Sequence, residues 1–370
     1  MNWKAIHKTL FLCAAFALFS LTTFASGGEE NKKEGEKFKP AEMIFHHVLD
    51  AYEWEFFSIG ETHITLPLPV ILYTDKGLDI FLSSEIHHHG KEGHYEKNGK
   101  HIHTINLVRG DIEYVMENHR FHHVKGGGMM LLDLSITKNV ASLLISALLT
   151  MFIFISVAAS YKKNAGKAPK GMQSFFEPII LFVRDDIAKT TIGERYERYL
   201  PYLLSLFFFI WFNNLMGLMP GGANLTGNIA VTFTLAALTF AITLFSAKKA
   251  FWGHIFMPPG VPAWLLPIMI PIELIGVISK PFSLMIRLFA NISAGHIMIL
   301  SLFSLTFIFQ SYVVGIFSAA FATAMNLLEL FVALLQAYVF TLLTSMYIGQ
   351  AVEEHHHEEH EHEHAHAAHH

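Results

Sequence analysis

The chain is 370 residues long, 52% hydrophobic and only 15% charged, with a formal net charge of −5 that depends on 24 histidines. Soluble domains carry about 25% charged residues, so this composition excludes an ordinary soluble protein and predicts a multi-pass membrane protein. The single cysteine, Cys13, excludes an internal disulfide framework.

The first segment, residues 1–27, has the pattern of a secretory signal peptide. Lys4 and Lys8 precede a short apolar core, and small residues follow from Ala25 to Gly28, as at a signal cleavage site. Thr23 stands where such a site prefers alanine, so an uncleaved first anchor is the alternative. Both interpretations place the next segment on the outer, periplasmic side.

Residues 28–130 are expected to form a periplasmic N-terminal domain with some β structure. After a charged linker, THITLPLPVILYT and KGLDIFLS predict strands around a turn at Asp75–Gly77. Twelve histidines fall in this segment, including His87, His88 and His89. No C-x-x-C or H-E-x-x-H spacing accompanies them, so a solvated, pH-sensitive loop is favoured over a metal site.

Residues 131–350 predict an all-α polytopic membrane domain. The first span runs from about Leu134 to Ser160 and ends at a lysine-rich loop, which marks the cytoplasmic side. The stretch FFEPIILFVRDDIAKTTIGERYERY mixes apolar and charged residues, as a helix lying in the interface would. Two shorter spans follow, at about 199–218 and 228–247, and the uncharged loop between them suits the outer side.

The last two apolar runs are too long for upright spans. Residues 264–309 would make a helix about 69 Å long, more than twice the ~30 Å hydrocarbon core. Residues 312–350 also exceed an upright span, so the two runs predict a strongly tilted helix pair. The alternative for the first run is a hairpin turning near Gly276–Pro281 or Asn291–Gly295. Five spans leave the C-terminus in the cytoplasm, whereas the hairpin would put it outside.

The tail at residues 351–370 is rich in histidine and glutamate, with nine histidines. Its low complexity predicts a disordered, weakly metal-attracting segment, to which we assign no function.

Polar residues form a stripe on the helix predicted at 264–309. At 100° per residue, Glu273, Lys280 and Arg287 share one face, which Asn291 joins, whereas His296 lies about 180° round from Arg287. Ionisable groups inside a membrane usually face a bundle interior or an aqueous cavity and mark an ion route. Lys280, near a helix end, is expected to snorkel towards the interface.

The final helix carries a matching stripe, in which Glu329 and Gln336 are seven residues apart and Tyr347 returns to the same face. Arginine cannot release its proton, so Arg287 is a permanent charge able to ionise a nearby carboxyl. His296 and Glu329 can exchange protons. This combination is typical of a proton path that must be interrupted, because a continuous water wire would dissipate the gradient.

The two stripes resemble the motifs of subunit a of the F-type ATP synthase membrane sector. The resemblance rests on SKPFSLMIRLFANISAGH and ELFVALLQAYVFTLLTSMY, with WFNNLMGLMP as a third motif, and covers about residues 130–350. It implies that Arg287 faces a ring of c subunits, helps to expel the proton from each incoming carboxyl, and blocks leakage between two offset half-channels. Gln336 would sit opposite Arg287, and Asn291 belongs to the arginine motif.

The resemblance also implies an acid/histidine pair in the outer half-channel, filled here by His296 and Glu329 in the reverse order to some bacterial members. Glu273 fits the acidic position of the inner half-channel, and Tyr347 extends the stripe.

The implied function is a proton-translocating stator subunit of a bacterial inner-membrane ATP synthase, without catalytic site, cofactor, metal or nucleic-acid partner. Implied partners are the c ring, the b-subunit peripheral stalk, other synthase subunits and membrane lipid. Two alternatives stand: a metal-ion transporter, prompted by the histidine-rich segments, and a structural anchor whose polar residues only pack helices. Proton or sodium coupling stays open, because it depends mainly on the ring.

Overall fold

The structure is a computed structural model, which describes residues 50–353 apart from gaps at 60–61, 98–99, 110–111, 118–119, 126–129, 165, 220–221 and 258–260. The described chain forms two compact units, each with its own contacts. The first includes everything up to Phe152, with Phe209–Asn228 and Ala290–Leu334; the second comprises Ile153–Phe208, Ile229–Phe289 and the chain from Leu335. The predicted signal segment and residues 354–370 of the histidine-rich tail lie outside the described residues, whereas Ala351 and Val352 belong to the last helix.

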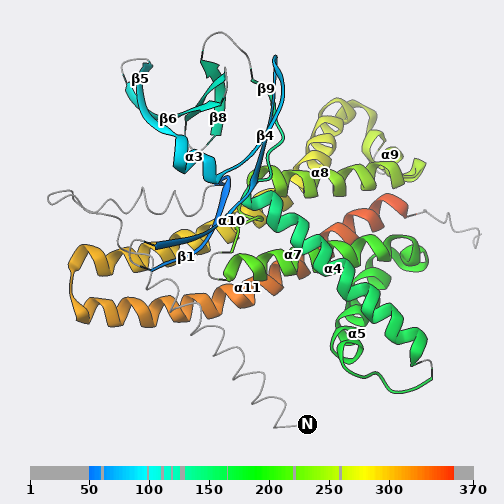
Figure 1. Cartoon of the computed structure of the whole chain (residues 1–370). Helices are drawn as coiled ribbons and strands as arrows, with labels where there is room; N and C mark the ends of the chain where they lie inside the picture. The colour runs from blue at the N-terminus through cyan, green and yellow to red at the C-terminus, as the bar shows by residue number, and fades with distance from the viewer. Residues whose placement is uncertain are drawn as a thin grey trace, which may run out of the picture. The chain divides into compact units, whose positions relative to one another are not determined.

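The first unit contains three antiparallel sheets (Figure 1). Strands β1 (Glu53–Ile59) and β2 (Thr62–Pro67) form a pair; β4 (Gly77–Leu82), β3 (Pro69–Thr74) and β9 (Met130–Asp133) form a second sheet in that order. A four-stranded meander follows the chain, with β5 (Lys91–Lys97), β6 (Lys100–Arg109), β7 (Ile112–Glu117) and β8 (Arg120–Lys125).

The predicted turn at Asp75–Gly77 is present and pairs β3 with β4, from Pro69 opposite Leu82 to Thr74 opposite Gly77. The predicted strand at 62–74 is instead divided at Leu68, and its halves join different sheets. Prolines on both sides of Leu68 explain the division, because proline has no N–H to donate to a ladder.

His87, His88 and His89 lie in the short helix α3 (Ser84–His89), so the prediction of a loop there is wrong. Ile86, in the middle of the segment, is buried in the core of the sheets and anchors this helical turn. His88 and His89 are exposed on it.

Alternating side chains of the strands build the core of this region. Val70 and Leu72 on β3 are fully buried, whereas Tyr73, which points to the opposite face of the same strand, is 46% exposed. Tyr114 is also fully buried, and its hydroxyl donates to Asp79 Oδ2 at 2.9 Å. Burial raises the pKa of Tyr114, and the Asp79 carboxylate adds to the rise, so the hydroxyl remains a donor at physiological pH.

We expect Leu72→Ala to destabilise this region by about 2–5 kcal/mol, because it empties a fully buried site on β3. The measurement is the temperature at which a protease begins to cut residues 50–133 of the full chain in membranes. Leu78→Ala is the matched control: Leu78 is 58% exposed on β4, so its loss should stay within about 0.5 kcal/mol. Equal effects of the two substitutions would contradict this description of the core.

The strand region is joined firmly to helix α4 (Lys138–Lys163). The Lys138 N–H donates to the Ala51 carbonyl at 2.9 Å, and the Asn139 N–H donates to Asp50 Oδ1 at 3.2 Å. Trp54 and Leu68 pack with Ala141 of α4 in a small cluster. Asp50 therefore satisfies an otherwise unpaired N–H at the helix start, where a negative charge is also favourable.

Five helical runs among the described residues are long and apolar enough to cross a membrane, so the predicted multi-pass architecture is confirmed. They are α4; the run Met172–Leu218; α8 (Ile229–Ser246); Leu266–Thr306 within α10 (Leu266–Phe309); and α11 (Tyr312–Val352). The short helix α9 (Lys249–Phe256) follows α8.

The amphipathic stretch expected in the interface is helical and leads into the second spanning run. It comprises α5 (Met172–Phe182), a π-helical segment (Val183–Lys189), α6 (Thr190–Ile192) and a 3-10 turn (Gly193–Arg195), and α7 (Tyr196–Leu218) follows directly. Gly193 has φ +73°, a conformation that glycine adopts without strain, and it begins the 3-10 turn.

Helix α10 is unbroken over 44 residues, so the hairpin alternative is wrong. Pro271 and Pro281 are accommodated within it, as prolines are in membrane helices. Only Gln310 and Ser311 separate α10 from α11, which has 41 residues. In the first unit, the end of α10 and the start of α11 run antiparallel, side by side (Figure 1).

Candidate functional site

The two long helices carry all of the site residues that the sequence predicts. Glu273, Arg287, Asn291 and His296 lie on α10, and Glu329, Gln336 and Tyr347 lie on α11. They divide between the two units: Asn291, His296 and Glu329 belong to the first, and the other four to the second.

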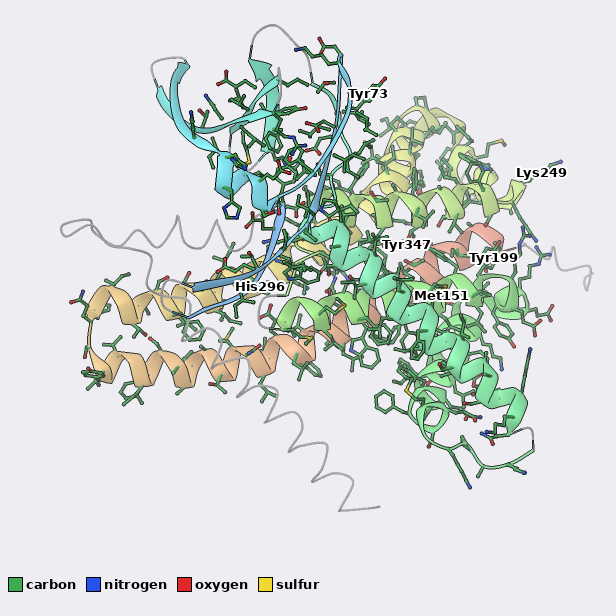
Figure 2. All side chains as sticks on the ribbon, in the orientation of Figure 1. Tyr73, Met151, Tyr199, Lys249, His296 and Tyr347 are labelled. Atoms are coloured by element: carbon green, nitrogen blue, oxygen red, sulfur yellow. The ribbon has the colours of Figure 1, made fainter. Side chains whose placement is uncertain are left out.

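In the first unit, His296 and Glu329 come together across the two helices. The His296 Nε2 atom lies 3.9 Å from Glu329 Oε1, and the two side chains are 17% and 5% exposed; Figure 2 labels His296. Neither oxygen of the Glu329 carboxyl has a hydrogen-bond partner among the described residues. A buried carboxyl in this state is costly when charged, so the pair has the chemistry of a proton-exchange site.

Gly295 makes the room that this carboxyl occupies. A Cβ atom added at Gly295 would lie 2.7 Å from Glu329 Oε1, which is closer than atoms approach without displacement. Gly217 of α7 lies on the histidine side, where an added Cβ would be 3.9 Å from His296 Nε2. Sequence reasoning missed both glycines, although an interior glycine costs a helix about 1 kcal/mol relative to alanine and so invites a packing explanation.

Asn214 of α7 is a second feature that sequence reasoning missed. Its Nδ2 atom donates to the Ala333 carbonyl of α11 at 3.3 Å, and the Thr226 hydroxyl donates to its Oδ1 atom at 2.8 Å. Asn214 is 1% exposed. It therefore ties α7 to α11 one turn beyond Glu329 and supports the position of the carboxyl.

In the second unit, Arg287 is half-buried on α10 and lies within Coulombic range of the Tyr347 hydroxyl on α11. Gln336 is almost fully buried, with 1% exposed. Glu273 lies within Coulombic range of Lys280 on the same helix, consistent with their shared face. Asn291, by contrast, is exposed in the first unit.

Lys280 is half-buried and makes specific contacts, which goes beyond the snorkelling expected of it. Its Nζ atom donates to Gln350 Oε1 at 2.7 Å and lies 5.3 Å from the centre of the Tyr347 ring. No three histidine, cysteine, aspartate or glutamate side chains are grouped to hold a metal ion in the part of the chain that the structure describes.

The comparisons with known proteins agree on the membrane region. The family model described as ATP synthase A chain matches residues 140–349, and a domain of unknown function matches residues 43–133. "ATP synthase subunit a 2" of Chlorobaculum tepidum is 39% identical over 334 residues, covering 88% of this chain and 76% of that protein.

Two other relatives have similar names. "ATP synthase subunit a" of Chloroherpeton thalassium is 44% identical over 66% of this chain and 77% of its own length. "ATP synthase subunit a 2" of Prosthecochloris aestuarii is 43% identical over 70% of this chain and 81% of its own length. With a family match over more than half its length and a relative covering most of it, the chain belongs to the ATP synthase A chain family.

Proposed function

We propose that this chain is the proton-conducting stator subunit of an F-type ATP synthase. It would provide two offset half-channels to and from the carboxyls of a rotating c ring, and so couple proton flow to rotation and ATP synthesis. The names of its relatives support this role. The observation that carries it is the buried His296–Glu329 pair, held between two long membrane helices.

In this proposal, His296 and Glu329 form the outer half-channel. A proton entering from outside would pass between the imidazole and the carboxyl, which lie 3.9 Å apart, before reaching the ring. Both groups can bind and release protons once burial and neighbouring groups tune them. The reversed order of the two residues keeps both chemical types and therefore the function.

Arg287 is the barrier between the half-channels. Its guanidinium stays charged, so it cannot pass a proton on, but it favours the ionised form of each ring carboxyl that approaches. Gln336 and Asn291 would accompany it at the ring, and Glu273 and Tyr347 would line the inner half-channel.

The energy available for rotation comes from the proton's passage by way of the ring. A proton crossing the membrane potential releases ~2.3 kcal/mol per 100 mV. Because Arg287 blocks the direct route, that energy is released only as the ring turns. ATP itself would be made by other subunits, not by this chain.

We also propose the topology and the assembly. Residues 1–27 would be a signal peptide, residues 28–130 a periplasmic domain, residues 131–350 the membrane domain, and residues 351–370 a cytoplasmic tail in a bacterial inner membrane. The b-subunit stalk, the other synthase subunits and lipid complete the surroundings. Lysine pairs at the end of α4 (Lys162–Lys163) and after α8 (Lys248–Lys249) support this orientation, because lysine-rich loops lie on the cytoplasmic side.

The glycine beside the carboxyl provides the test. We expect Gly295→Ala to lower ATP-driven proton uptake into inverted membrane vesicles by about tenfold, because the new methyl group displaces the Glu329 carboxyl. The obstructing atoms are at the free end of a flexible side chain, so the helices themselves need not move. Uptake is normalised to the amount of assembled complex.

Gly276→Ala is the matched control, since Gly276 lies on the same helix with open space around its Cβ position. Both substitutions raise helix propensity equally, so only Gly295→Ala should lower uptake. Normal uptake by the Gly295 variant would remove the outer half-channel from the proposal.

A further inference from the structure

A small cavity lies among α8, α9, α10 and α11 in the second unit, and its mostly apolar wall carries a few polar side chains. Its volume is about 20 Å³, and one water molecule needs roughly 10–15 Å³ by the same measure. The lining includes Thr239 and Thr243 of α8, Val277 and Lys280 of α10, and Tyr347 of α11, a residue that Figure 2 labels. Hydroxyl and ammonium groups on its wall give a water the polar partners that it requires.

Lys280 holds two sides of this cavity together. Its ammonium donates to Gln350 Oε1 on α11 at 2.7 Å and lies 5.3 Å from the centre of the Tyr347 ring. Hydrogen bonds from a charged group are about twice as strong as neutral ones, and a cation over an aromatic face adds to them. One side chain of α10 therefore sets the positions of two side chains of α11.

Titratable groups act on Lys280 from two helices. Glu273 acts on it from the same helix, and Tyr347 faces it from α11, where Arg287 acts on the tyrosine in turn. The cavity lining from α8 and α9 is neutral, made of threonine and phenylalanine side chains. The Tyr202 and Thr239 hydroxyls, 2.8 Å apart, hold the α8 side in place.

The cavity lies near the lysine-rich turn between α8 and α9. The Lys248 N–H donates to the Ala351 carbonyl at 3.0 Å, which joins this turn to the end of α11 one residue after Gln350. Lysine-rich turns mark the cytoplasmic side of a membrane protein. The cavity is thus at the end of the helices where an inner half-channel would open.

We propose that Lys280 is a positioning residue of the inner half-channel, where it holds Tyr347 beside a one-water cavity and ties Gln350 of α11 to α10. This inference rests on the proposed function. The water accepts a proton from the side that faces the middle of the membrane and donates one towards the cytoplasm. Neither Lys280 nor Tyr347 therefore changes its net protonation. Lys280 acts by keeping the cavity open and by holding α10 and α11 in a fixed relative position there.

The experiment measures passive proton conductance in inverted vesicles from which the catalytic subunits have been stripped. The cytoplasmic face is then outermost, so the pH at each face can be varied separately. We expect Lys280→Met to lower conductance about tenfold, the size of a lost charged hydrogen bond, and to change its dependence on external pH alone. Lys280→Arg should restore most of the conductance, and Gln350→Leu should reproduce the same one-sided change.

Three results would overturn the inference. They are normal conductance in Lys280→Met, a change in pH dependence that is equal at both faces, and loss of the chain from the membrane in Lys280→Met and Lys280→Arg alike. The proposed function fails separately, if vesicles carrying the unsubstituted chain conduct no protons beyond those that lack it. Conducting native vesicles together with an unaffected Lys280→Met variant would therefore reject the role of Lys280 alone.

Discussion

Replacing Arg287 with alanine is expected to abolish ATP-driven proton pumping, although the complex should still assemble. Without a fixed cation, nothing ionises the arriving ring carboxyl and nothing separates the two half-channels. Arg287 is only half-buried on α10, so the truncation leaves the helix packing largely intact. Arg287→Lys should restore little, because an ammonium in an apolar site readily gives up its proton whereas a guanidinium does not.

The measurement is acidification of inverted vesicles on addition of ATP, with the assembled complex quantified in the same membranes. Arg195→Ala is the control, since Arg195 is an exposed arginine in the 3-10 turn before α7. Coupled pumping that survives in Arg287→Ala would reject the synthase mechanism. Loss of metal-ion flux in place of proton flux would support the transporter alternative.

Glu329→Gln is expected to reduce pumping by about 100-fold, the usual contribution of a positioned proton donor or acceptor. The amide has nearly the same shape as the buried carboxyl but cannot take up or release a proton. Rates of ATP-driven acidification in vesicles check this value. Glu329→Asp retains the acid in a shorter form and should keep more activity than Glu329→Gln.

A reciprocal exchange separates chemistry from packing at this pair. His296→Glu alone places two carboxyls together and should pump poorly, as should Glu329→His alone. The double variant restores one acid and one imidazole, so it should pump better than either single variant. If the double variant pumps no faster than the slower single variant, the exact placement of each side chain, and not its capacity for proton exchange, governs this site.

The long helix pair and its charged residues could be predicted from the sequence, because their signals are local. An arginine and two glutamates inside runs of about forty apolar residues stand out without any knowledge of folding. Helical angles also placed Lys280 and Glu273 on one face, and the two lie within Coulombic range of each other. The length of the apolar run at 264–309 is compatible with one tilted helix and with a hairpin, and the unbroken helix α10 decides between them.

Features that depend on distant contacts could not be predicted in the same way. The roles of Gly295 and Asn214 come from atoms of α11, which the sequence near either residue does not contain. The meander β5–β8 was missed because its strands are histidine- and charge-rich, which weakens the alternation that marks a strand. Helix α3 forms because Ile86 reaches a tertiary core, so tertiary packing decided what a loop-like sequence became.

The two-residue link at Gln310–Ser311 has a consequence for how this hairpin can change in length. His296 lies fourteen positions before Gln310, and Glu329 lies eighteen positions after Ser311. Because only two residues link α10 and α11, these counts fix which residues face each other. An insertion of one residue between His296 and the link would rotate His296 about the axis of α10 by about 100° and shift it by about 1.5 Å, and an insertion between the link and Glu329 would do the same to Glu329 on α11. The His296–Glu329 pairing therefore survives only length changes that both arms share and that amount to whole helical turns, so the short link couples the lengths of the two arms.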